Sequence, residues 1–262
     1  MTFPLYLDIG FAKLHPHPVF ETLAYFVGFR FYLLTRSKGA MPASKAIWII
    51  VAAILGAAAG SKLLYWLENP AETWTRWNDY AYMMGGKTIV GGLLGGLIAV
   101  EWAKKRVGVT RSTGDDMAVP LVVGIAIGRI GCFLAGLDDH TYGTPTGWPT
   151  AIDFGDGIPR HPTQLYEIVF LLLLGAGLSV LRRGARTGAW RLPDGALFQL
   201  FMAGYLLFRL AVDFVKPTPH PFAGLNNVQL ACIAGLVYYA WLLRRCPAHA
   251  SAAKESASPY AE

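Results

Sequence analysis

The chain has 262 residues, of which 54% are apolar and only 15% are charged, with a formal net charge of +6. Soluble domains carry about 25% charged residues, so this composition argues against a single soluble globule. The apolar residues occur in blocks of about twenty, the length that a helix needs to cross a hydrocarbon layer of ~30 Å. The composition therefore predicts an all-α membrane protein that crosses the bilayer several times.

The cysteines and the N-terminus add two expectations. No Cys-x-x-Cys spacing is present, so neither a disulfide framework nor a thiolate metal site is predicted from Cys132, Cys232 and Cys246. The first residues, MTFPLYLDIG, do not form a basic segment followed by an apolar one. A cleaved signal peptide is therefore not expected.

Seven apolar stretches are candidate transmembrane helices. The third is the weakest because its glycines contribute little hydropathy, although glycine is common where transmembrane helices pack closely. The predicted spans are residues 18–35, 43–67, 87–103, 116–136, 162–182, 195–215 and 228–245. We predict one transmembrane domain over residues 1–245 and a disordered cytoplasmic tail over residues 246–262, whose Ala- and Ser-rich sequence offers no core.

The lysines and arginines predict the orientation of these spans. Of the 23 basic residues, fourteen fall on one side of the predicted spans, five on the other side, and four within spans. Because basic residues accumulate on the cytoplasmic side, the N-terminus is predicted outside and the C-terminus inside. The loop over residues 137–161 and five of the six histidines then lie on the outer face, where we expect the functional site.

Charged residues of five predicted spans lie at a similar depth below the outer surface. An ionisable group within a span costs about 2.5–3.5 kcal/mol or more unless it is paired or hydrated. At about 1.5 Å per residue, most of them lie about 5–10 Å below the outer helix ends. The set comprises Glu21, Lys62, Arg129, Glu167, Arg209 and Asp213.

Two explanations account for this layer of charges. The groups could pair only with one another to hold helices together, but structural pairs have no reason to share one depth. Arg129 and Arg209 are also well shaped to hold a phosphate group by bidentate hydrogen bonds. The pattern favours a lipid headgroup site in the outer leaflet.

The segment RHPTQLYE, residues 160–167, leads into the fifth predicted span. Proline is favoured at the first position of a helix, which places His161 just outside the span at the membrane surface. A neutral imidazole there can act as a general base. The alternative, which applies above all to Gln164 and Tyr166, is that the segment only caps and anchors the helix.

Other polar and glycine clusters are better explained without a ligand. Residues 15–17, His-Pro-His, predict an extended surface segment, and the glycines of residues 91–96 predict a packing face because no strand precedes them. One further set lacks a defined ligand spacing and is better explained as a solvated loop: Asp138, Asp139, His140 and His161. Neither a metal ion nor another cofactor is therefore expected.

Four short motifs follow one another over roughly residues 50–240. They are GGLLGG at residues 91–96, GRIG at residues 128–131 with Gly143 downstream, RHPTQLYE at residues 160–167, and LFR at residues 207–209 with Asp213 and Lys216 downstream. Together they resemble the prolipoprotein diacylglyceryl transferase family; the second and third motifs are the specific ones. That family has seven helices with the N-terminus outside and the C-terminus inside, in agreement with the topology predicted above.

The resemblance implies a transferase of lipoprotein biosynthesis in the bacterial cytoplasmic (inner) membrane. It would move a diacylglyceryl group from phosphatidylglycerol to the thiol of a prolipoprotein cysteine at the outer leaflet. The expected partners are phosphatidylglycerol, a prolipoprotein or another thiol acceptor, and membrane lipid, with no nucleic acid. By this resemblance Arg129 and Arg209 bind the phosphate and stabilise its charge as it leaves. His161 and Glu167 assist deprotonation of the thiol, whose ordinary pKa is about 8.5. The residues expected to bind substrate are Glu21, Gly91, Gly92, Gly131, Gly143, Gln164, Tyr166 and Asp213.

The chain departs from the family pattern at four places, one of which is an added carboxylate, Glu101, in the third predicted span. Val90 stands where members typically carry a histidine directly before the glycine cluster, and Cys132 stands where an asparagine is common. The usual aromatic segment of the first helix is replaced by HPHPVFE at residues 15–21. Because the missing histidine is often proposed to take part in catalysis, His17, Glu21 or His161 is the candidate to replace it.

These departures leave two alternatives to the standard reaction. The chain could be a divergent member that uses a different acceptor, or a phospholipid-binding or transport protein without catalysis. Transport would require polar residues that continue to the cytoplasmic side, where the spans offer mainly Arg30 and Glu101. An enzyme is therefore favoured.

Overall fold

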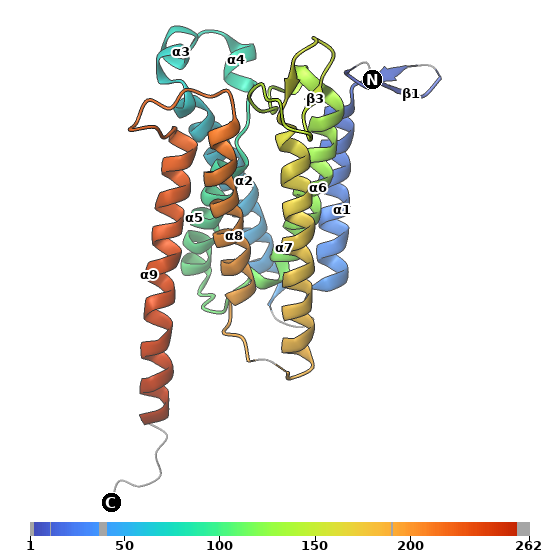
Figure 1. Ribbon diagram of the computed structural model, residues 1–262. Helices are drawn as coiled ribbons and strands as arrows, with labels where there is room; N and C mark the ends of the chain where they lie inside the picture. Colours follow the sequence, from blue (N-terminus) through green and yellow to red (C-terminus); the bar gives the residue numbers. More distant parts are fainter. Residues whose placement is uncertain (1–2, 11, 37–40, 190, 256–262) are drawn as a thin grey trace, which may run out of the picture.

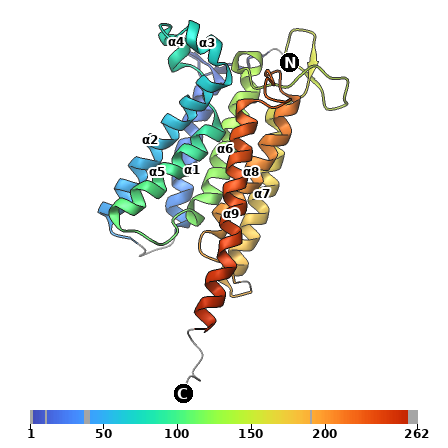
Figure 2. The ribbon, with the colours of Figure 1, turned by 90° about the vertical axis from the view of Figure 1, so that its left-hand side faces the viewer.

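The part of the chain that the structure describes contains seven long helices, which lie side by side and run along a common direction (Figures 1 and 2). The structure, a computed structural model, describes residues 3–10, 12–36, 41–189 and 191–255, with side chains up to residue 242. The long helices coincide within a few residues with the seven predicted stretches, except that the last continues farther. They are α1 (Pro16–Thr35), α2 (Ala43–Glu68), α5 (Ile89–Val107), α6 (Asp115–Ala135), α7 (Thr163–Arg186), α8 (Ala196–Val212) and α9 (Asn227–Glu255).

Within the described residues, four helical segments are long and apolar enough to cross a membrane. They are Ala43–Glu68, Asp115–Asp139, Thr163–Arg186 and Ala196–Val215, and the apolar part of α9, Asn227–Leu242, is shorter. Large apolar side chains point away from the bundle, as at Leu34, Trp48 and Leu173, which are 76%, 66% and 69% exposed. Extensive exposed apolar surface marks contact with a partner or a membrane. The chain is therefore all-helical with apolar, membrane-type helices, and seven spans with the N-terminus outside stay a prediction.

The short elements gather at the end of the bundle that also carries the N-terminus (Figure 1). The helices α6 and α8 finish at this end in 3-10 turns, η1 (Gly136–Asp139) and η2 (Asp213–Val215). The others are α3 (Pro70–Thr75), α4 (Tyr80–Met84), and two antiparallel hairpins, β1 (Leu7–Asp8) with β2 (Lys13–Leu14) and β3 (Ile152–Asp153) with β4 (Pro159–Arg160). This is the end that the sequence predicts to face outward.

The helices α2 and α5 pack closely through glycines. A Cβ atom added at Gly56, Gly60, Gly91 or Gly95 would lie within 3.0 Å of the partner helix. Small residues four apart let two helix backbones approach closely. The glycine cluster therefore forms the packing face that was expected of it.

The helix α8 carries the centre of the core. Its Phe201, Met202, Tyr205 and Leu206 are fully buried, and it packs against α6, α7 and α9. Residues three and four apart lie on one face of a helix. Arg209 follows Leu206 and Tyr205 at these spacings. It therefore lies on the same buried face of α8, and its guanidinium group is inside the bundle.

The last helix continues beyond the expected end of its span. It extends to Glu255, into the segment for which a disordered tail was predicted. Residues 256–262 lie outside the described residues, so the division into a domain over residues 1–245 and a tail stays a prediction.

Candidate functional site

Three charged side chains from three helices meet inside the bundle. The Nε atom of Arg129 on α6 lies 2.9 Å from Oε2 of Glu167 on α7, and Nη1 of Arg209 on α8 lies 3.6 Å from the same oxygen. Their side chains are only 8%, 2% and 8% exposed. The two arginines from separate helices thus converge, as the sequence predicts, with a carboxylate between them.

Asp213 and Lys216 complete this charged cluster. Arg209 donates from Nη2 to Oδ1 of Asp213 (2.8 Å), and Nζ of Lys216 lies 3.9 Å from that oxygen. Lys216 follows the apolar segment directly. Its burial and the repulsion by Arg209 and Arg129 lower its pKa to about 7, and the attraction of Asp213 and Glu167 offsets only part of this shift. The net charge of the cluster therefore changes near neutral pH.

Several buried polar atoms of the charged cluster have no hydrogen-bond partner among the described residues. They include Nε and Nη1 of Arg209, Nε of Arg129 and Oδ2 of Asp213. The contact of Arg129 Nε with Glu167 is an ion pair without hydrogen-bond alignment. A buried polar group without a partner costs about 1–3 kcal/mol, and native structures keep few of them. Guanidinium nitrogens that still have hydrogens to donate suit the oxygens of a phosphate group.

The sequence analysis missed one member of the charged cluster. The hydroxyl of Tyr205 donates to Oε1 of Glu167 at 2.6 Å, and both side chains are buried. This bond leaves Oε2 to the two arginines and fixes the carboxylate between them. The only sequence signal for Tyr205 is its position one helical turn before Arg209.

His161 lies in a loop that is pressed against the start of α7. Gly143 donates its N–H to the carbonyl of His161 (2.8 Å), and a Cβ at Gly143 would lie 2.6 Å from Cβ of His161. The imidazole Nδ1 is 3.1 Å from the hydroxyl of Tyr166, and the ring packs edge-on against Trp148. His161, Tyr166 and Trp148 therefore form part of the surface between α7 and α8, and the charged cluster is held by other side chains.

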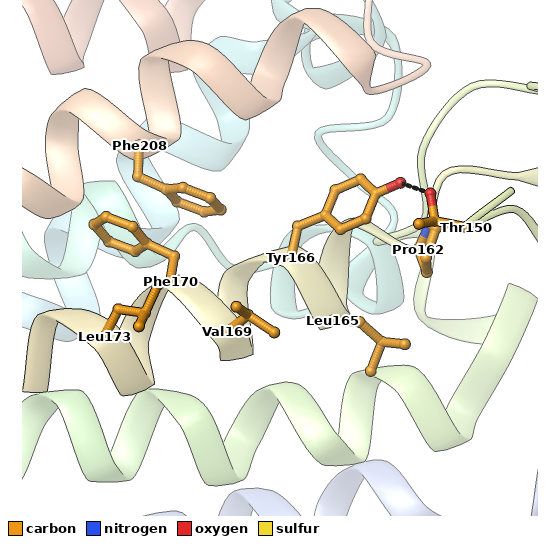
Figure 3. A pocket seen from close by; sticks show the side chains of 8 residues that line it. All are labelled: Thr150, Pro162, Leu165, Tyr166, Val169, Phe170, Leu173 and Phe208. Carbon is orange, nitrogen blue, oxygen red and sulfur yellow. Dashed lines mark hydrogen bonds between the residues drawn. The ribbon is translucent and has the colours of Figure 1, made fainter. Parts of the chain in front are cut away.

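An open cavity of about 650 Å³ lies on this surface (Figure 3). The hydroxyl of Tyr166 bonds to that of Thr150 (2.8 Å) at one end, and Phe170 stacks on Phe208 at the other. A second cavity of about 340 Å³ shares Tyr166 and Phe208 with it. The lining residues are Thr150, Pro162, Leu165, Tyr166, Val169, Phe170, Leu173 and Phe208.

The cavity and the charged cluster belong to the same turns of α7 and α8. Tyr166 and Phe208 line the cavity, and the next residues, Glu167 and Arg209, are buried in the cluster. Successive residues of a helix point in different directions. These two turns therefore place an apolar surface on the outside and ionic groups on the inside.

Two of the six charges predicted to share one layer have other partners. Glu21 pairs with Lys87 (Oε1 to Nζ, 2.5 Å), and Lys62 donates to backbone carbonyls of residues 84–86. Nearer partners at the helix ends therefore hold Glu21 and Lys62, which do not join the charged cluster. The other four meet in the charged cluster. That all six charges share one depth stays a prediction.

The remaining predicted residues make contacts between elements. Gln164 donates to the hydroxyl of Thr141 (3.1 Å) and so ties the loop to α7. Gly131 packs against Phe20 of α1, where an added Cβ would lie 2.6 Å from the Cβ of Phe20. Residues 91 and 92 lie along the contact of α5 with α2. Their role in substrate binding stays a prediction.

Comparisons with known proteins agree with the motifs. The family described as prolipoprotein diacylglyceryl transferase matches residues 4–245. Three curated relatives are each named phosphatidylglycerol–prolipoprotein diacylglyceryl transferase. The relative from Polynucleobacter asymbioticus is 30% identical over 267 residues, covering 92% of this chain and 95% of its own. The relative from Paramagnetospirillum magneticum is 29% identical over 272 residues, covering 92% and 94%. The relative from Nitratidesulfovibrio vulgaris is 33% identical over 245 residues, covering 85% and 87%.

Proposed function

Because this chain belongs to the prolipoprotein diacylglyceryl transferase family, we propose that it transfers a diacylglyceryl group from phosphatidylglycerol to a cysteine thiol of a prolipoprotein. The reaction forms a carbon–sulfur bond and breaks the bond between the glyceryl carbon and a phosphate oxygen, which releases glycerol phosphate. We place it at the outer leaflet of a bacterial inner membrane, at the end of the bundle that carries the short elements. The chain then crosses the membrane seven times with its N-terminus outside.

The convergence of Arg129 and Arg209 carries this proposal. Their guanidinium groups meet at Glu167, and two nitrogens of Arg209 have no hydrogen-bond partner among the described residues. A phosphodiester oxygen bound there would satisfy these donors. The same donors stabilise the charge that the phosphate gains as the carbon–oxygen bond breaks, and charge stabilisation of this kind is worth about 10²–10³ in rate for one donor.

The charges of the cluster also suit a phosphodiester. Among these five side chains, two arginines balance Glu167 and Asp213, so a protonated Lys216 leaves one positive charge for one phosphodiester. A neutral Lys216 leaves none. Glu68, at the end of α2, adds a carboxyl group that interacts with Lys216 and Arg209. Headgroup binding is therefore expected to favour the protonated amine and to take up a proton above pH 7.

The apolar cavity between α7 and α8 provides the place for an acyl chain. Its lining is made almost wholly of aliphatic and aromatic side chains, the surface that ligand pockets for apolar groups present. It is open and lies on the same helical turns as the charged cluster. A lipid whose chains lie in this cavity can therefore direct its phosphate toward Arg209.

The decisive experiment combines transfer and complementation. Purified protein receives labelled phosphatidylglycerol and a lipobox peptide, and the gene is expressed in a strain depleted of its own prolipoprotein transferase. We expect transfer and rescue by the wild type, loss of both in Arg129→Ala and Arg209→Ala, and retention in Arg30→Ala, whose exposed side chain lies on α1. Full transfer by both arginine variants contradicts the proposal.

One observation favours a second candidate, a protein that binds phospholipid without transfer. Val90 is 1% exposed and occupies the position before the glycine cluster, where the resemblance to the family implies a histidine. This candidate predicts tight, Arg209-dependent binding of phosphatidylglycerol with no labelled peptide product. The transfer assay therefore separates the two.

A further inference from the structure

Three potential metal ligands from distant parts of the chain come together at the outer end of α6. His17 lies in the first turn of α1, Cys132 in the last turn of α6, and Asp139 in η1. Nδ1 of His17 is 2.7 Å from Oδ1 of Asp139 and 3.9 Å from Sγ of Cys132. One ligand atom from each residue lies within 4.8 Å of the others.

We propose that His17, Cys132 and Asp139 bind a divalent transition metal ion, with Zn²⁺ as the best match. Zinc is bound in proteins by this combination of imidazole nitrogen, thiolate sulfur and carboxylate oxygen. The thiolate disfavours Mg²⁺ and Ca²⁺, which prefer oxygen ligands alone. Three protein ligands leave the fourth tetrahedral position open, as catalytic zinc sites do.

The distances fit a tetrahedral ion after small movements. Bond lengths of about 2.0–2.1 Å to nitrogen and oxygen and about 2.3 Å to sulfur require separations of about 3.3 Å for N···O and about 3.6 Å for S···N. The separations from His17 are 2.7 Å to Asp139 and 3.9 Å to Cys132. The first separation must grow by about 0.6 Å and the second must shrink by about 0.3 Å. The third separation, from Sγ of Cys132 to the carboxylate oxygen of Asp139, is at most 4.8 Å.

The surrounding side chains orient the ligands as in metal sites. Nδ1 of His17 faces the other two ligands, and its other nitrogen, Nε2, lies 3.7 Å from Oε2 of Glu21. The second oxygen of Asp139 accepts a hydrogen bond from Thr141 (2.8 Å). The contact of Glu21 is longer than a hydrogen bond, whereas the hydrogen bond from Thr141 to Asp139 is an outer contact of the kind that holds a metal ligand in place.

Charge and access also agree with a bound ion. A thiolate at Cys132 and the carboxylate of Asp139 together balance the two positive charges of the ion. Cys132 is 7% exposed and the side chain of Asp139 is 11% exposed, whereas that of His17 is 34% exposed. The site is therefore shielded on one side and open on the side of α1.

The proposed metal site adjoins the charged cluster. Nη1 of Arg129 lies 3.7 Å from Sγ of Cys132, and Nε of the same arginine contacts Glu167. One arginine thus joins the two groups of residues. A metal-bound thiolate and a phosphate held by Arg129 would be neighbours.

The role of the ion rests on the proposed function. The open position takes the acceptor thiol, whose proton passes to water as the sulfur binds the ion. The sulfur then forms a bond to the glyceryl carbon, and the electron pair of the breaking carbon–oxygen bond leaves with glycerol phosphate. One proton is released and no oxidant or reductant is needed. The ion would thus promote deprotonation of the acceptor thiol. This is the step that the family histidine, replaced here by Val90, is expected to assist.

The test is metal binding to the full chain in detergent, without lipid or acceptor. The protein is stripped with a chelator and titrated with Zn²⁺ against a chromogenic chelator, and separately with Co²⁺. We expect one ion per chain and a thiolate-to-cobalt charge-transfer band. Cys132→Ser removes the band, and His17→Ala and Asp139→Asn each weaken Zn²⁺ binding at least tenfold.

The matched control replaces the other two cysteines. Cys232 is fully buried in the core, so Cys232→Ser combined with Cys246→Ser is expected to retain one ion and the band. Substoichiometric binding by the wild type, or a band that survives in Cys132→Ser, overturns the site even if transfer is observed. Full transfer by the stripped protein overturns the role of the ion in the reaction. A bound ion without any transfer would refute the proposed function and leave the metal site standing.

Discussion

Replacement of Arg209 by lysine tests the headgroup site without removing its charge. The ammonium group of Arg209→Lys can still pair with Asp213, which accepts from Nη2 in the wild type. It cannot also supply the donors at Nε and Nη1, which have no hydrogen-bond partner among the described residues. Loss of one charge-assisted hydrogen bond costs about 1.5–3 kcal/mol, which corresponds to roughly a 10- to 150-fold decrease in rate. Arg209→Ala should additionally lose stability, because it leaves Asp213 buried without its partner.

The assay follows label from phosphatidylglycerol into a lipobox peptide, with thermal unfolding in detergent as the measure of folding. We expect Arg209→Lys to unfold near the wild-type temperature and to transfer label 10- to 150-fold more slowly. The matched control, Arg30→Lys, changes the same side chain at an exposed position of α1 and should keep the wild-type rate. Wild-type transfer by Arg209→Lys would refute the assignment of the free guanidinium nitrogens to the phosphate.

Three further predictions concern stability and pH. Tyr205→Phe should lose about 1–3 kcal/mol of stability, because it leaves a buried carboxylate oxygen without its donor. The control, Tyr239→Phe, should keep its stability because the buried hydroxyl of Tyr239 has no partner among the described residues. Equal shifts of the unfolding temperature in the two variants would contradict this prediction. Gly95→Ala should lose about 1–3 kcal/mol of stability through overpacking, since its Cβ would lie 2.8 Å from a Cα of α2. Gly96→Ala should keep its stability, because the atom nearest to its added Cβ would be 3.6 Å away. Thermal unfolding of the two variants tests this difference. Because the pKa of Lys216 is lowered to about 7, the amine is charged below pH 7 and loses its charge above it. Calorimetric affinity for a short-chain phosphatidylglycerol, a phosphodiester whose own charge stays constant in this range, should therefore fall as the pH rises from 6 to 8. Lys216→Arg, which stays charged over this range, should abolish the pH dependence of the affinity. An unchanged pH dependence in Lys216→Arg would refute the role of the Lys216 amine.

The motifs of the sequence were sufficient for the family. The segments GRIG and RHPTQLYE carried the resemblance, and the comparisons over residues 4–245 confirm it. The apolar blocks also gave the positions of the long helices, because the length of a hydrocarbon-crossing helix and its hydropathy are local properties. The convergence of Arg129 and Arg209 was predicted from their similar depth and from the fit of two guanidinium groups to one phosphate, since the helical rise converts residue number into distance along the bundle.

Rotation about the helix axes could not be predicted in the same way. Depth placed Glu21 and Lys62 with the arginines, but the orientation of α1 and α2 turns them toward Lys87 and toward the carbonyls that follow α4. Tyr205 was missed because a tyrosine in an apolar helix has no distinctive pattern.

The sequence by itself determined the membrane-type helices, their order and the family, because these follow from hydropathy and from residues close together in the chain. Only the tertiary structure brought His17 beside Cys132 and Asp139, which lie 115 and 122 positions farther along the chain. Contacts of that kind depend on how α1 packs against α6, and helix packing is set by side-chain shape on both surfaces. No spacing within one segment can encode it.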